Sequence, residues 1–126
     1  MRAKFGPAGN SESFSAKGYK SNKDIPKYLA EFGLNAYEYQ CGRGVKISEQ
    51  SAREFGKLAK DSNISLSIHA PYYISLSSTE EEKRDNSIRY IVDSALAANA
   101  MGATRIIVHS GSCGKLSREQ ALSYAL

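Results

Sequence analysis

Two histidines, the only two of the chain, occupy equivalent places in its sequence. His69 follows the β-prone run ISLSI and His109 follows RIIV, so each is predicted to end a strand. A single histidine at a strand end is more often a hydrogen-bonded core or rim residue than a metal ligand. Adjacent strands, however, lie about 4.8 Å apart, and a zinc–imidazole bond measures about 2.0–2.1 Å. Unless the strands stagger too far, the two rings can reach one ion, and we predict His69 and His109 as metal ligands.

Few other side chains can complete such a site. Zinc takes four ligands in a closed site, or three and a water molecule in a catalytic one. Glu38 has three possible roles: a ligand, a carboxylate that holds a histidine N–H, or an ion-pair partner of Arg105, and the last is favoured. Cys41 and Cys113 fit no metal-binding spacing and are expected to be unpaired thiols. The missing ligands would have to come from further strands.

Other candidate groups lie in the loops that follow the predicted strands. Tyr72 and Tyr73 come directly after His69, and exposed aromatic rings in such a place can stack on bases. For each ring, packing beneath the loop is the equal alternative. Arg43 lies between two glycines and could bind a phosphate. The loop Ser110 to Lys115 precedes a predicted helix and resembles an anion-binding nest.

These residues depend on an alternation of strand and helix patterns along the chain. The predicted strands are Ala3–Gly6, Ala36–Gln40, Ile64–His69 and Arg105–Val108. Four helices are predicted between and after these strands. The first has an apolar stripe from Ile25 to Phe32 and ends at Gly33, and the second is capped by Ser48 and ends at Asn63. The third begins at a capping box, Thr79–Glu82, and ends at Gly102, and the fourth begins at a capping box, Ser117–Gln120. In the longest helix, the stripe expected to be buried is Ile88, Ile91, Val92, Ala95 and Asn99.

Repeated βα units imply parallel strands with right-handed crossovers. The strand phases place Leu66 and Ile68 on one face, beneath the helices. The opposite face carries the polar residues Glu38, Ser67, His69, Arg105 and His109. A polar inner face suits a barrel lumen, whereas a doubly wound sheet needs two apolar faces. No GxGxxG motif follows the first strand.

We therefore predict an α/β fold of four consecutive βα units, the N-terminal half of a (β/α)8 TIM barrel. A whole barrel takes about 250 residues, so residues 1–126 are expected to form a single partial domain whose C-terminal half is absent. The net charge of +4 favours a polyanion such as nucleic acid without selecting it. The chain shows neither a signal peptide nor about 20 consecutive apolar residues, which predicts a cytoplasmic protein with no membrane partner.

The segments HAPYYISL, from His69, and VHSGSCGK, from Val108, resemble the endonuclease IV family of xylose isomerase-like barrels. The resemblance covers most of the chain but only the N-terminal half of a typical member. It implies DNA repair by a cluster of three zinc ions that cleaves double-stranded DNA 5′ to abasic sites. By that resemblance, His69 and His109 are ligands of one zinc, Tyr72 enters the DNA at the lesion, and Arg43 lies in a DNA-recognition loop. Zinc-activated water is the implied nucleophile, so no side chain is predicted as catalytic.

The sequence also departs from the family pattern. Its first segment reads KFGPAGNSESF where the family has a GAHVS-like segment, and Ser110 stands where proline is usual. The bridging glutamate and the other ligands belong to strands that this sequence does not contain, so these residues alone are expected to be inactive. A metal-dependent sugar isomerase or epimerase on the same barrel remains the alternative. The open edges of a half-barrel are further expected to favour self-association.

Overall fold

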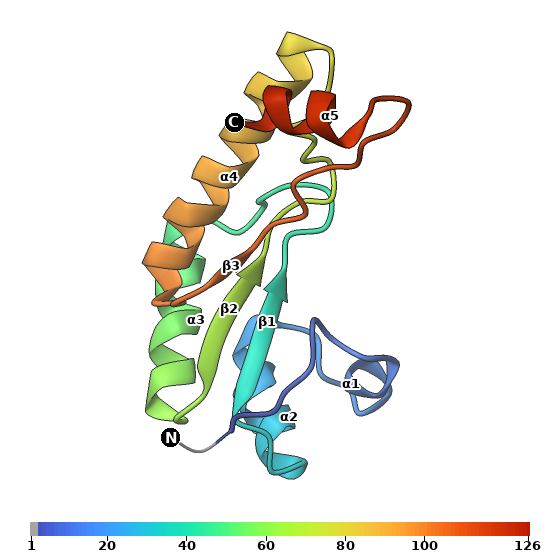
Figure 1. Ribbon diagram of the computed structural model, residues 1–126. Coiled ribbons are helices and arrows are strands. Elements are labelled where there is room, and N and C mark those ends of the chain that lie inside the picture. The colour runs from blue at the N-terminus through green and yellow to red at the C-terminus, as the bar shows by residue number, and fades with distance from the viewer. Residues whose placement is uncertain (1–2) are drawn as a thin grey trace.

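The computed structural model describes residues 3–126, in which helices alternate with parallel strands (Figure 1). In chain order the elements are α1 (Glu12–Ala16), the 3-10 helix η1 (Asn22–Asp24), α2 (Ile25–Glu31), β1 (Ala36–Gln40), α3 (Glu49–Asp61), β2 (Ser65–His69), α4 (Glu81–Met101), β3 (Ile106–Ile107) and α5 (Arg118–Ala125). The strands form one parallel sheet in the order β1-β2-β3. Among the described residues, no helix combines the length and apolar character that a bilayer-spanning helix requires.

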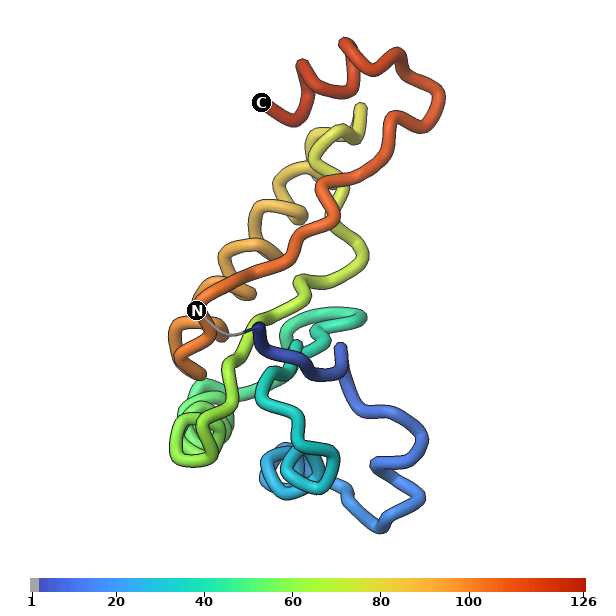
Figure 2. Tube along the Cα trace, turned by 60° about the horizontal axis from the view of Figure 1, so that its bottom comes forward, coloured from blue at the N-terminus to red at the C-terminus, as the bar shows by residue number. Residues whose placement is uncertain are grey.

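Helices α2, α3 and α4 cover one face of this sheet (Figures 1 and 2). The core lies between these two layers, and the predicted outward-facing residues Leu66 and Ile68 are buried in it. Their partners come from all three helices and from β1, and include Ile25, Leu29, Phe55, Met101 and Tyr37. This arrangement is a partial (β/α)8 barrel, as the alternating pattern predicts.

The first predicted strand is present only as an irregular extended segment. It runs beside β1, where Phe5 O accepts a hydrogen bond from Ala36 N and Pro7 O accepts one from Glu38 N, 3.0 and 3.1 Å long. The pairing extends past Pro7, because Ala8 forms an isolated parallel bridge with Glu38, whose carbonyl accepts the N–H of Gly9 over 2.9 Å. A Cβ atom at Gly6 would lie 1.6 Å from the Ala36 carbonyl oxygen, so only glycine permits this close approach.

Most other boundaries agree with the prediction. Strand β1 has the predicted bounds, Ser48 Oγ accepts the N–H of Ser51 to cap α3, and Gly102 ends α4 in the left-handed conformation, with φ 69°. The capping box of Ser117 with Gln120 opens α5. Two predictions are wrong: α1 forms inside a predicted loop, where it buries Phe14, and β3 is shorter than the run predicted for it.

The capping box predicted for α4 is also wrong. Glu80 occupies the N-cap position and makes no side-chain capping bond. Its backbone carbonyl instead accepts the N–H groups of Lys83 and Arg84, so the helix starts one residue later than a Thr79 cap would require.

Helix α4 packs on the sheet through a different face from the one predicted. Ile88 and Val92 are 54% and 50% exposed, and Phe32, predicted for the buried stripe of α2, is exposed as well. The residues that α4 buries are mostly small: Ser87, Ser94, Ala97, Ala98 and Met101. The hydroxyls of Ser87 and Ser94 donate to carbonyls one turn earlier in the helix, so their burial leaves no unpaired polar group.

Candidate metal-binding site at the carboxyl ends of the strands

His69 is the last residue of β2 and is 8% exposed. Its Nδ1 atom lies 2.8 Å from the carbonyl oxygen of Ala70. Because a carbonyl can only accept, Nδ1 carries the proton in the neutral ring, and Nε2 keeps the lone pair that a metal ion requires. Metal-binding histidines commonly donate their second ring N–H in this way.

His109 lies two residues beyond β3 and is exposed to solvent. The strand register pairs His69 with Ile107, so His109 extends further along its strand direction. The two imidazole rings nevertheless approach each other, with their centroids 4.9 Å apart. The structure therefore brings together the two residues predicted as metal ligands, and two neutral imidazoles are suitable donors for zinc.

The pair does not form a complete metal site with the other residues that the structure describes. Within residues 3–126, no group of three or more histidine, cysteine, aspartate or glutamate side chains could hold a metal ion. The two thiols are free, as predicted: Cys113 is exposed, whereas Cys41 is buried, and burial raises the pKa of its thiol. Any zinc held here would need ligands from outside these residues.

Tyr72 lies against both histidines. Its ring centroid is 5.1 Å from that of His69 and 6.3 Å from that of His109. Its hydroxyl donates to Oε1 of Gln40 over 3.0 Å, although 59% of the residue remains exposed. Tyr73 turns elsewhere, with its ring 6.4 Å from that of Tyr90. Of the two predicted aromatic residues, only Tyr72 therefore belongs to the site.

Arg43 lies in the loop after β1, at the same end of the sheet. The flanking glycines both have positive φ, 49° for Gly42 and 130° for Gly44, which residues with a side chain rarely adopt. Gly42 O accepts the N–H of Tyr72, so this loop is tied to the loop that carries the tyrosine. Arg43 is exposed and has no carboxylate partner among the described residues.

The favoured role of Glu38, an ion pair with Arg105, is wrong. The carboxylate instead accepts a 2.9 Å hydrogen bond from Nε2 of Gln40 and a 3.5 Å bond from the hydroxyl of Ser67. Gln40 also accepts from Tyr72, so it connects Glu38 to the aromatic residue over the histidines. Sequence reasoning missed this role of Gln40, although its position on the inner face beside Glu38 was a signal for it.

The loop that carries His109 is held by the loop after β2. Ser110 O accepts the N–H of Leu76 over 2.9 Å, and Ser112 O accepts the hydroxyl of Ser77 over 2.8 Å. A Cβ atom at Gly111 would lie 2.9 Å from the Ser77 hydroxyl, and its φ of 120° also favours glycine. These contacts fix the backbone around His109. Whether the loop binds anions through its N–H groups stays a prediction.

Comparisons with known proteins agree with this arrangement. The family model described as xylose isomerase-like TIM barrel matches residues 26–126. An uncharacterized protein of Methanocaldococcus jannaschii is 37% identical over 91 residues, which are 72% of this chain and 32% of the relative. Probable endonuclease 4 of Aquifex aeolicus is 27% identical over 120 residues, which are 95% of this chain and 42% of the relative. The chain thus spans about a third to two fifths of these relatives' length.

Solved structures with the same fold are more distant in sequence. D-psicose 3-epimerase from Clostridium cellulolyticum superposes with a TM-score of 0.67 at 15% identity, over 84% of this chain and 39% of that one. A D-tagatose 3-epimerase-like protein superposes with a TM-score of 0.65 at 20% identity, over 79% of this chain and 39% of that one. The family model covers most of the chain, and several relatives of the endonuclease 4 type match it as well. The chain therefore belongs to the xylose isomerase-like TIM barrel family, as a partial barrel similar to endonuclease IV.

Proposed function

We propose that the chain is the N-terminal half of a zinc-dependent apurinic/apyrimidinic endonuclease, which cleaves double-stranded DNA 5′ to abasic sites during DNA repair. The observation that carries this proposal is the approach of His69 and His109, with ring centroids 4.9 Å apart, at the strand ends. Active sites of (β/α)8 enzymes lie at this end of the barrel. Relatives named probable endonuclease 4 supply the reaction class. The unpaired thiols agree with the cytoplasmic location that we expect.

His69 and His109 would hold one zinc ion, with the remaining ligands and further ions contributed by the other half of the barrel. Bound zinc supplies an activated water and stabilises negative charge on a phosphodiester. The contact between Nδ1 of His69 and the Ala70 carbonyl orients that ring, so its Nε2 is presented without a rearrangement of the backbone.

Tyr72 and Arg43 would contact the DNA. The Tyr72 ring is exposed at the mouth of the site, where it can stack on a base or enter the gap left by a missing one. Arg43 lies on the adjoining loop and forms no ion pair among residues 3–126, and a guanidinium binds phosphate through paired hydrogen bonds. The net charge of +4 agrees with a polyanionic substrate.

Substitution of the histidines in the complete barrel tests the proposal. His69→Ala and His109→Ala should each lower the zinc content and abolish incision of an abasic duplex, because each removes one ligand. Zinc is measured by atomic emission and incision by gel electrophoresis. Full activity with unchanged zinc in either variant would contradict the assignment.

Tyr72→Ala tests the proposed DNA contact, and Tyr73→Ala is the matched control because its ring is equally exposed but lies away from the histidines. Stacking on a base is worth about 1–3 kcal/mol, so Tyr72→Ala should weaken binding of abasic DNA about fivefold or more while Tyr73→Ala leaves it unchanged. Equal effects of the two substitutions on DNA binding would show that Tyr72 does not contact the DNA.

A metal-dependent sugar isomerase or epimerase is the second candidate. A sugar enzyme needs a small closed pocket. The contact of Tyr72 with Gln40 and with the buried His69 narrows the access to that histidine, which favours this candidate. The structural neighbours named as sugar epimerases share the fold alone. Assays of the complete barrel with abasic DNA and with ketoses distinguish the two proposed activities. Interconversion of sugars without incision of DNA would contradict the nuclease proposal and support the epimerase.

A further inference from the structure

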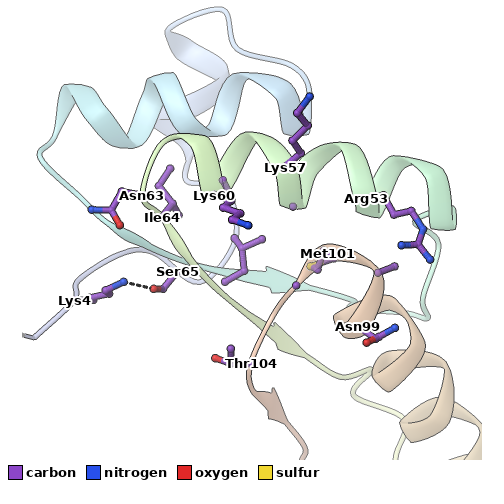
Figure 3. Close-up of a pocket in the computed structure, with 15 residues that line it drawn as sticks. Lys4, Arg53, Lys57, Lys60, Asn63, Ile64, Ser65, Asn99, Met101 and Thr104 are labelled. Atoms are coloured by element: carbon purple, nitrogen blue, oxygen red, sulfur yellow. Dashed lines mark hydrogen bonds between the residues drawn. The ribbon is translucent and has the colours of Figure 1, made fainter. Parts of the chain in front are cut away.

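A hollow lined by both polar and apolar residues lies at the opposite end of the sheet, where the strands begin. It has a volume of about 480 Å³ and is bounded by α3, the end of α4 and the start of β2 (Figure 3). The candidate metal ligands lie at the far, carboxyl end of β2, so the hollow belongs to neither the histidine site nor the function proposed above. Its volume falls in the range of about 300–1,000 Å³ that is usual for small-molecule sites.

The titratable side chains that line this hollow are all basic: Lys4, Arg53, Lys57 and Lys60. Arg53 is paired with Glu49 on its outer side. Among residues 3–126, none of the three lysines has a carboxylate within ion-pair distance. The hollow therefore concentrates positive charge that the protein itself does not neutralise.

The cations approach the hollow from separate parts of the chain. Figure 3 shows Lys60 and Arg53 reaching down from α3 and Lys4 lying on the other side, whereas the Lys57 side chain rises away. Lys4 donates to the hydroxyl of Ser65 at the start of β2. Neutral hydrogen-bonding residues also line the hollow, namely Asn63, Asn99 and Thr104.

The helix ends do not cancel this charge. Helices α3 and α4 both terminate at the hollow, and a helix C-terminus carries about half a negative charge. A lysine near a helix C-terminus can therefore have the sole role of balancing this partial negative charge. The two helix ends together carry about one negative charge, which a single lysine balances. The other exposed lysines are free to bind an anion from solution.

Close packing of α3 on α4 sets the shape of the hollow. A Cβ atom at Gly56 would lie 2.3 Å from the carbonyl oxygen of Met101, so the helices approach each other there through glycine. The hollow opens beside this contact. Arg53 and Lys60 are thus carried by a helix that is packed on the core, whereas Lys4 lies in the extended segment before β1 and is held by its hydrogen bond to Ser65.

We propose that this hollow binds a small phosphorylated anion that carries more than one phosphate group. A carboxylate offers only two acceptor oxygens, whereas several cations and neutral donors surround this space. A chain of linked phosphates satisfies donors on both sides at once. This proposal is independent of the metal site and of the nuclease activity.

Calorimetric titration of the chain with inorganic tripolyphosphate at low salt tests it. The affinity of the double variant Lys4→Gln/Lys60→Gln for tripolyphosphate should be at least about tenfold lower, because this variant loses two charge-assisted contacts. Lys20→Gln/Lys46→Gln removes the same charge at exposed positions outside the hollow, and it should stay within about twofold of the parent. Equal weakening of both double variants, or no binding by the parent, would overturn the proposal.

A third variant tests whether weaker binding comes from the changed charge of the hollow or from a loss of folded protein. Circular dichroism is used to check that each variant is folded. Asn99→Asp retains every lysine but places a carboxylate in the hollow, so it should also weaken tripolyphosphate binding. His69→Ala should leave the affinity unchanged, which separates this site from the nuclease proposal. A single-stranded oligonucleotide that binds more tightly than tripolyphosphate, with the same dependence on Lys4 and Lys60, would replace the small ligand by nucleic acid.

Discussion

At the scale of single residues, the position of Tyr72 over His69 makes the reactivity of that histidine depend on the tyrosine. Tyr72→Ala removes the ring 5.1 Å from His69, so modification of His69 by diethyl pyrocarbonate should become several-fold faster. Peptide mass spectrometry measures the rate, with the exposed His109 as internal reference. Tyr73→Ala should change nothing, and an unchanged His69 rate in Tyr72→Ala would show that the ring does not cover it.

The phenol of Tyr37 makes stability depend on pH in the alkaline range. The residue is buried, its hydroxyl donates to Asn10 over 2.9 Å, and burial raises its pKa above the ordinary value of 10.0. Above that pH the unfolded phenol ionises while the folded one stays neutral, so stability present at lower pH is lost as the pH rises. The loss is at most about 1.4 kcal/mol per pH unit.

Tyr37→Phe should therefore flatten the alkaline decline in urea-unfolding free energy, while it costs about 0.5–1.5 kcal/mol at neutral pH through the lost hydrogen bond. Tyr73→Phe, in which the changed ring is exposed, is the control and should leave the decline as it is. A decline of the same slope in Tyr37→Phe would show that other groups cause it.

The two histidines illustrate what could be predicted at this scale. His69 ends its strand as the local pattern predicts, whereas His109 lies two residues beyond the shorter β3, and parallel pairing of the two strands still brings the histidines together. The contact of Glu38 with Gln40 had a signal in their shared strand face, but its extension to Tyr72 could not be predicted, because it depends on the fold of the loop after β2. Side-chain contacts between different elements depend on such tertiary placement.

At the scale of elements, the packing of α3 on α4 depends on Gly56. Helix propensity alone predicts that Gly56→Ala stabilises the protein by about 0.5–1 kcal/mol. The added Cβ would lie 2.3 Å from the Met101 carbonyl, however, and overpacking costs about 1–3 kcal/mol. We expect net destabilisation, measured as a lower urea midpoint. Gln50→Ala at an exposed position of α3 should shift it little; a stabilised Gly56→Ala protein would contradict the packing argument.

Helix α4 shows where hydrophobic periodicity reaches its limit. The pattern predicted a helix and its end at Gly102, yet it assigned the wrong face to the core. Close approach to the sheet favours small side chains, and Ser87 and Ser94 satisfy their own hydroxyls within the helix. A rule that ranks residues by hydrophobicity places Ile88 and Val92 inside, although their size would keep α4 away from the sheet.

At the scale of the whole molecule, the unclosed barrel leaves apolar surface available to a second copy. Ile88, Val92 and Leu96 form an exposed stripe along α4, and β3 has no further strand beside it among residues 3–126. Exposed strand edges and contiguous apolar patches both favour association. We expect the sedimentation coefficient of the chain to rise with concentration.

The contribution of α4 to this association can be separated from that of the strand edges. Val92→Gln/Leu96→Gln removes most of the stripe without touching the sheet, so the concentration dependence should decrease. Arg89→Gln, on the same helix but outside the stripe, is the control. If association persists unchanged in the double variant, the α4 stripe is not responsible, and the strand edges or other exposed apolar residues such as Phe5 and Leu122 mediate it. A monomer at all concentrations in the parent chain would instead mean that neither surface recruits a second copy.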